Sequence, residues 1–171
     1  PDRTPTLGPA FKPGEVNTAL SVRTDVGGNG VNVSRAVLAA GLATRAVVPA
    51  ASGDPLNELL GRAQVPVVPV QVDGNTRTNL TVVDPTGTTT KLNTPGATLD
   101  AASEAELIRV LVANSRGARW LVLAGSLPPG TDSELYVRII HAVRAATPAD
   151  RAPAIAVDTS GDALAAVVAE A

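Results

Sequence analysis

Along the chain, segments whose hydrophobic residues have the spacing of a strand take turns with segments that have the spacing of a helix. Short runs that are apolar throughout or alternate with polar residues predict strands at 18–26, 44–49, 65–72, 76–83, 88–92, 119–124 and 154–158. Helical spacing follows the glycines at 27–30 up to about residue 40, and recurs at 53–64, from 99 onward, at 132–146 and at 163–170. This order predicts an α/β fold of three layers, in which helices flank a mostly parallel sheet.

The middle of the chain predicts a small, partly separate sheet. Residues 65–72 contain Pro66 and Pro69, which favours an edge strand. Residues 76–83 and 88–92 flank an Asp-Pro-Thr-Gly turn and predict a hairpin. One face of the first hairpin strand carries Thr76, Thr78, Leu80 and Val82, and the other carries Arg77, Asn79, Thr81 and Val83, with Lys91 on the returning strand. Pattern alone leaves two uses for that polar face, solvent exposure or ligand binding.

Three glycines in four positions, Gly27, Gly28 and Gly30, stand directly before a predicted helix. Glycine lets the backbone approach a ligand closely, and the first turn of a helix offers unpaired N–H groups. Such a loop suits a hydroxyl-rich or anionic small molecule, although a tight turn explains the glycines equally well. The spacing excludes the dinucleotide pattern G-x-G-x-x-G, because Val33 occupies the third glycine position. It also excludes a P-loop, because no Gly-Lys-Ser/Thr follows.

Composition narrows the functional classes. Hydrophobic residues make up 44% of the 171 residues but aromatic residues only 2%, so the core must consist of alanine, valine and leucine. The formal net charge is −2 without a basic stripe, and we expect no nucleic-acid partner. With no cysteine and one histidine (His141), we expect neither disulfides nor a metal site in this chain. No apolar run approaches a membrane span and no signal peptide opens the chain, so we expect a cytoplasmic protein without membrane contact.

The stretch at 27–36 fits G-G-x-G-x-N-x-[SA]-R-A and resembles the sugar-binding motif of the PfkB family of carbohydrate kinases, in the ribokinase-like superfamily. Further segments resemble the same family in the same order: D-R-T at 2–4, K-P-G-E-V-N at 12–17, T-R-x-N at 76–79, T-T-T-K-L-N at 88–93, A-G-S-L-P-P-G at 124–130 and V-D-T-S-G at 157–161. The resemblance implies a partial ribokinase-like α/β domain over 1–171, corresponding to the N-terminal half of a family member, with a β lid formed by strands at about 11–26 and 65–92. It points to the branch that acts on fructose and tagatose phosphates.

The resemblance also implies roles for particular residues. The sugar is expected to be held by Asp2, Gly27, Gly28, Asn32 and Asn79. The phosphate already on the sugar is expected to meet Arg77 and Lys91, with Ser126 nearby. A carboxylate suits sugar hydroxyls because it only accepts hydrogen bonds, and the planar fork of arginine suits a phosphate. The implied reaction is ATP- and Mg²⁺-dependent phosphorylation of fructose 1-phosphate, or of fructose 6-phosphate or tagatose 6-phosphate. Family members also pair through the lid, which makes a homodimer possible.

Two features depart from the family pattern. The K-P-N-x-x-E segment and the G-x-G-D motif, whose aspartate is the family's general base, do not occur, so no catalytic residue is assigned. Asp54 follows Gly53 without a glycine-rich turn and is not assigned that role. Asn29 stands where this branch more often carries lysine. A non-catalytic sugar-phosphate-binding or regulatory fragment therefore remains the alternative, followed by a nucleoside or ribose kinase and, more remotely, a dinucleotide-binding oxidoreductase.

Overall fold

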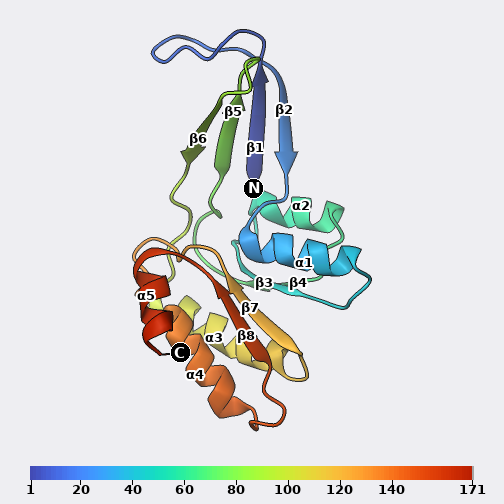
Figure 1. Ribbon diagram of the computed structural model, residues 1–171, viewed down its shortest axis with the longest axis vertical. Helices are drawn as coiled ribbons and strands as arrows, with labels where there is room; N and C mark the ends of the chain where they lie inside the picture. Colours follow the sequence, from blue (N-terminus) through green and yellow to red (C-terminus); the bar gives the residue numbers. More distant parts are fainter. Residues whose placement is uncertain (171) are drawn as a thin grey trace.

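A computed structural model describes residues 1–170 and confirms an α/β fold. A four-stranded sheet projects from a body of helices and parallel strands (Figure 1). The elements in chain order are β1 (Asp2–Leu7), β2 (Ala19–Asp25), α1 (Asn29–Ala39), β3 (Ala46–Pro49), α2 (Pro55–Arg62), β4 (Val67–Val70), β5 (Asn79–Val83), β6 (Thr89–Asn93), α3 (Ala101–Ser115), β7 (Trp120–Ala124), α4 (Leu135–Ala146), β8 (Ala154–Asp158) and α5 (Gly161–Ala169).

The projecting sheet has the strand order β2-β1-β5-β6. β1 lies antiparallel to β2 and parallel to β5, and β5 and β6 form the expected hairpin, in which Leu80 faces Leu92. The hairpin turn is held by Asp84, whose carboxylate accepts hydrogen bonds from the Thr86 hydroxyl and from the backbone N–H groups of Thr86 and Thr88. These contacts favour the charged carboxylate and hold the pKa of Asp84 below its ordinary value. The hairpin is therefore fixed by its own turn chemistry.

Two predictions about this sheet were wrong. β1 was not predicted, and it forms an inner strand although Pro5 cannot donate to a neighbouring strand. Residues 67–70 were assigned to the lid, but β4 instead pairs in parallel with β3. The side chains explain this pairing, because Val67 packs with the cluster around α1 and α2 while Val68 and Val70 pack beneath α3. Apolar contacts on both faces make β4 a core strand.

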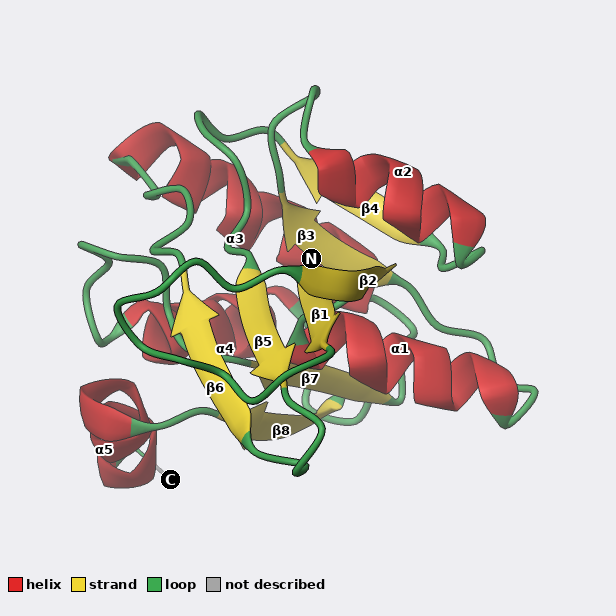
Figure 2. Cartoon of the chain, turned by 90° about the horizontal axis from the view of Figure 1, so that it is seen from above, coloured by secondary structure: helices red, strands yellow, loops and turns green. Residues whose placement is uncertain are grey.

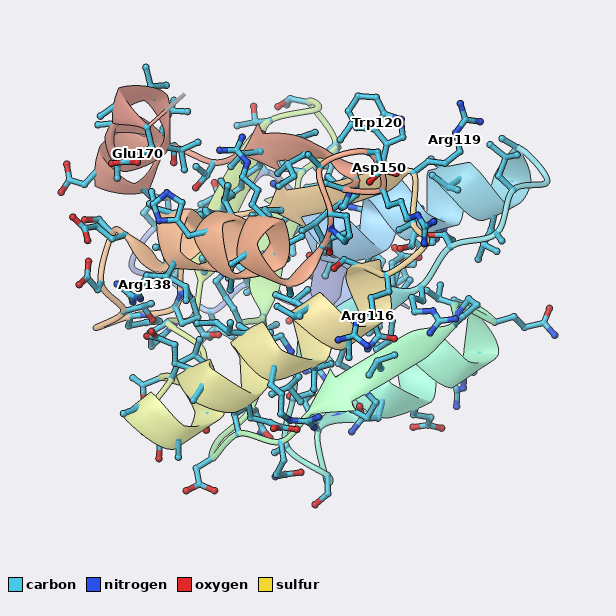
Figure 3. The ribbon with its side chains drawn as sticks, turned by 90° about the horizontal axis from the view of Figure 1, so that it is seen from below. Arg116, Arg119, Trp120, Arg138, Asp150 and Glu170 are labelled. Carbon is cyan, nitrogen blue, oxygen red and sulfur yellow. The ribbon has the colours of Figure 1, made fainter. Side chains whose placement is uncertain are left out.

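The body has three layers, as predicted (Figure 2). One apolar cluster joins α1 and α2 to one face of β3, through Val31, Leu56 and Leu60. The larger cluster joins α3 and α4 to the other face and contains Leu135, Ile139 and Val143. The Arg138 guanidinium on α4 lies 2.8 Å from the Glu104 carboxylate on α3 and fastens these two helices together (Figure 3). Parallel strands covered on both sides expose their functional edge at the carboxyl ends.

The parallel strands form two separate pairs, β3-β4 and β7-β8, within the described residues. Every residue of β7 is apolar, yet Trp120 is 60% exposed. His141 is exposed, and its Nε2 atom lies 3.3 Å from the Glu170 carboxylate. Over residues 1–170, no helix is both long and apolar enough to cross a membrane.

Candidate functional site

A cavity of about 1130 Å³ extends along β3 and β7, from the segments before these strands to the region beyond their carboxyl ends. Three loops line it at the carboxyl ends: the glycine loop before α1, the segment before β5, and the turn after β7. Five of the eight residues assigned from the sequence line it, namely Gly27, Gly28, Arg77, Asn79 and Ser126. These residues are up to about a hundred positions apart in the chain, so their convergence is a property of the fold.

The glycine loop is shaped by its neighbours and by its own backbone. Gly27 is buried, and a Cβ atom at this position would collide with the Asp2 carboxylate. Gly28 has φ +111° and immediately precedes α1, with no side chain capping the helix. Only glycine adopts that backbone conformation without strain. The loop therefore brings the start of α1, with its unpaired N–H groups, to the cavity.

Asp2 and Asn79 form one unit on neighbouring strands. They pair directly across β1 and β5, and the Asn79 side-chain N–H group donates to Asp2 Oδ1 at 2.8 Å. Asn79 Oδ1 is buried and has no hydrogen-bond partner. A buried acceptor without a partner is costly, so this oxygen is suited to a ligand hydroxyl or a bound water.

Arg77 bridges two of the loops. Its guanidinium Nη1 donates to Ser126 Oγ at 3.0 Å, which joins the segment before β5 to the turn after β7. Gly96 packs against the backbone of Arg77, since a Cβ atom at Gly96 would lie 3.0 Å from the Arg77 nitrogen. The arginine is exposed and so keeps other N–H groups available for an anion.

Asp54 has a role that the sequence did not reveal. Its buried carboxylate accepts from Leu56 N at 2.8 Å and caps α2. The same carboxylate accepts from the backbone and the hydroxyl of Thr76, the residue before Arg77. Asp54 therefore anchors the loop that carries Arg77.

Replacing Asp54 with alanine should lower the free energy of unfolding by about 2–4 kcal/mol, because a helix cap and two partly buried donors of Thr76 lose their partner. Asp100→Ala is the matched control, since Asp100 caps α3 through Ser103 N but makes no distant contact. We expect Asp100→Ala to lower the free energy of unfolding by about 1 kcal/mol. Urea denaturation of both variants measures the difference, and equal costs would contradict the anchoring role.

The remaining assigned residues lie outside the cavity lining. Lys91 pairs with Thr81 and shares a sheet face with Asp2 and Asn79, but it stands about 7 Å further along the hairpin. Asn32 is an exposed residue of α1. The structure thus gathers the glycine loop, Asp2, Arg77, Asn79 and Ser126, and leaves these two at its periphery.

Asn29 and Asp158 connect the glycine loop to the end of β8. Asn29 Nδ2 donates to Asp158 Oδ2 at 3.4 Å, and the Asp158 carbonyl accepts from Gly125 N at 2.8 Å. The Gly125 carbonyl in turn accepts from the Tyr136 hydroxyl at 2.9 Å. Burial, aided by the charge of Asp158, raises the pKa of Tyr136, so the phenol keeps its proton and acts as a donor. This network fixes the loop that carries Ser126.

Over residues 1–170, no three His, Cys, Asp or Glu side chains lie close enough together to hold a metal ion. The described residues therefore do not form a metal centre from their own side chains alone.

Comparisons with known proteins agree on one family. The family model described as pfkB family carbohydrate kinase matches residues 5–170. The chain is 36% identical to the ATP-dependent 6-phosphofructokinase isozyme 2 of Escherichia coli K12 over 146 residues, 84% of this chain and 45% of that protein. It is 34% identical to the 1-phosphofructokinase of Rhodobacter capsulatus over 171 aligned positions, 95% of this chain and 51% of that protein.

Solved structures give the same result. The crystal structure of Escherichia coli phosphofructokinase-2 in complex with fructose-6-phosphate matches with a TM-score of 0.84 and 29% identity, covering 98% of this chain and 54% of that one. The chain thus spans about half the length of the relatives it matches.

Proposed function

The chain belongs to the pfkB family of carbohydrate kinases, and we propose that it supplies the sugar-phosphate-binding part of an ATP-dependent kinase of fructose phosphates. The observation that carries this proposal is the group formed by Arg77, Asn79, Asp2 and Ser126 around the glycine loop at one cavity. Oxygen atoms that can accept hydrogen bonds from sugar hydroxyls lie there beside a cationic group that can bind a phosphate. A phosphorylated sugar carries both kinds of group.

In this proposal each residue has a positioning task. Asp2 and the unpartnered Asn79 Oδ1 accept hydrogen bonds from sugar hydroxyls. Arg77 turns its guanidinium to the sugar's phosphate and Ser126 holds that guanidinium in place. Gly27 and Gly28 let the substrate approach the start of α1. Such positioning is a large part of phosphoryl-transfer catalysis.

The phosphoryl group transferred would come from ATP. The described residues contain no metal-binding cluster and the sequence contains no G-x-G-D motif, so no transfer step is assigned to this chain. Its proposed contribution is to bind and orient the acceptor. Fructose 1-phosphate is the substrate we propose first, with fructose 6-phosphate and tagatose 6-phosphate as alternatives.

Calorimetric titration of the chain with fructose 1-phosphate, fructose 6-phosphate, tagatose 6-phosphate, fructose and inorganic phosphate tests the proposal. We expect one phosphorylated sugar to bind more tightly than both fructose and phosphate, because it alone satisfies the hydroxyl and phosphate groups together. The tightest ligand identifies the substrate. Binding of phosphate alone with equal affinity would contradict a sugar site.

The projecting sheet also offers a face for a second copy of this chain. Strand register places Val22 and Leu92 on the face opposite Asp2 and Asn79, and these two residues are 59% and 56% exposed. Leu80 lies between them on the same face. Exposed apolar patches of this kind mark association surfaces, so we propose that two copies pack through this face.

Val22→Asp should shift the chain towards the monomer, because a carboxylate placed in an apolar interface must be desolvated. The control is Val168→Asp on α5, where the side chain is similarly exposed at 64% but lies outside the sheet. Sedimentation equilibrium of the unaltered chain and both variants measures the association constant. A monomeric unaltered chain, or equal weakening by both substitutions, would exclude this interface.

A further inference from the structure

Gly125 begins the turn after β7, and both of its peptide groups are held by distant parts of the chain. Its N–H group donates to the Asp158 carbonyl, at the end of β8, at 2.8 Å. Its carbonyl accepts from the Tyr136 hydroxyl, on α4, at 2.9 Å. The peptide planes on the two sides of Gly125 are therefore fixed to two different elements of the body.

The bond from Tyr136 sets the direction in which the turn continues. Gly125 has φ +109°, a conformation that glycine adopts readily, and it has no side chain that packing could hold. Its carbonyl belongs to the same planar peptide group as the nitrogen of Ser126. A donor that fixes this carbonyl therefore also fixes where Ser126 leaves the strand.

Tyr136 is itself held firmly. It lies in the first turn of α4, is 9% exposed, and belongs to the apolar cluster that contains Leu135 and Ile139. The ion pair of Arg138 with Glu104 ties the same helix to α3. Burial raises the pKa of the phenol, so the hydroxyl keeps its proton and remains a donor. The hydroxyl is therefore a fixed point in the core from which the turn is held.

On the cavity side, the turn leads to Arg77. Ser126 follows Gly125 directly, and its Oγ atom accepts from Arg77 Nη1 at 3.0 Å. Ser126 and Arg77 are both exposed, so this hydrogen bond, more than burial, orders the guanidinium. Ordering a free arginine costs side-chain entropy, and an arginine that is ordered before the ligand arrives binds an anion more tightly. The position of Ser126 thus decides how the guanidinium is presented to a ligand.

We propose that Tyr136 is a positioning residue of this site, whose hydroxyl holds the Arg77 guanidinium, through the Gly125 carbonyl and Ser126, in the direction that a sugar's phosphate requires. The proposal rests on the function proposed above. Tyr136 does not line the cavity and is not expected to touch the ligand. Its hydroxyl nevertheless contributes to the preference for a phosphorylated over an unphosphorylated sugar.

The first test needs no ligand and follows the Nε–Hε signal of Arg77 by NMR. Ser126→Ala removes the acceptor and so marks where the signal lies when the guanidinium is released. We expect Tyr136→Phe to move the signal part of the way to that position, although the substituted side chain makes no contact with Arg77. Ile140→Val is the matched control, since Ile140 lies one turn further along α4, is 8% exposed, and loses only a buried methyl group of the same cluster. This control should leave the Arg77 signal in place.

The second test measures calorimetric dissociation constants for fructose and for the sugar phosphate that the unaltered chain binds most tightly. Tyr136→Phe should weaken binding of the sugar phosphate by about 3- to 10-fold, the range that one neutral hydrogen bond accounts for. Binding of fructose should not change, and Ile140→Val should change neither. A 4-aminophenylalanine at position 136 restores a donor and should recover affinity for the sugar phosphate. A 4-methylphenylalanine, of similar size but without a donor, should not.

An Arg77 signal that stays in place in Tyr136→Phe would overturn the proposal. Equal weakening of fructose and of the sugar phosphate, or equal effects of Tyr136→Phe and Ile140→Val, would overturn it as well, because either result indicates a general loss of stability. Where Tyr136→Phe impairs folding, the 4-amino and 4-methyl replacements are compared with each other, and equal Arg77 signals in the two would contradict a role for the donor. If the unaltered chain binds no sugar phosphate, the function proposed above fails, and the Arg77 signal alone decides whether Tyr136 positions the guanidinium.

Discussion

Replacing Arg77 with alanine should weaken binding of the phosphorylated sugar by about 10- to 100-fold, because a hydrogen bond to a charged partner contributes about 1.5–3 kcal/mol. Binding of unphosphorylated fructose should change little, since the arginine is proposed to meet only the phosphate. The guanidinium already crosses from the segment before β5 to Ser126 and is exposed at the cavity mouth. Calorimetric dissociation constants for both ligands measure the contrast.

Two further variants separate the role of the Arg77 side chain from a general effect of losing an arginine. Arg77→Lys retains the charge but loses the planar fork, so it should recover only part of the affinity. Arg23→Ala removes an exposed arginine of β2, which pairs with Asp25 at 2.6 Å and does not line the cavity, and should leave affinity unchanged. Equal weakening of fructose and of its phosphate by Arg77→Ala would contradict a phosphate-binding role.

Local sequence signals predicted most of the fold. β8 has the predicted bounds, 154–158, and α3 begins at Ala101, close to residue 99 where the helical spacing starts. β1 escaped prediction because it carries Pro5 and a single buried apolar residue, Leu7. Its identity as a strand depends on β2 and β5 on either side, which are distant in sequence.

The candidate site was predictable in its residue types but not in its contacts. The sequence indicated Arg77, Asn79 and the glycine loop, because each belongs to a local motif. The anchoring of Thr76 by Asp54 and the bond between Arg77 and Ser126 join segments 22 and 49 residues apart, and no periodicity encodes them. Long-range contacts of this kind require the folded chain.

The division of the parallel strands into two pairs could not be predicted from the sequence either. The sequence of β7 is apolar at every position, which predicts a strand that is covered on both faces. The structure pairs it with β8 alone and leaves Trp120 exposed. The apolar sequence of β7 therefore predicts deeper burial than the structure shows for this strand.

Replacing Gly27 with alanine should abolish detectable sugar binding and lower stability, because the added methyl group would collide with the Asp2 carboxylate. Either Asp2 moves away from Asn79, or the glycine loop moves away from the cavity. Overpacking at such a site typically costs about 1–3 kcal/mol. Thermal denaturation and calorimetric titration measure the two effects.

Gly61→Ala is the matched control for this prediction. A Cβ atom at Gly61 meets nothing within 4 Å, and the residue lies inside α2, outside the cavity lining. This substitution should leave binding intact and stabilise the helix by about 0.5–1 kcal/mol. Removing the Asp2 side chain should relieve the collision, so Gly27→Ala should cost less stability in an Asp2→Ala background than alone. If Gly27→Ala lowers stability equally in both backgrounds, the glycine is needed for its backbone conformation and not for the space that it leaves to the Asp2 side chain.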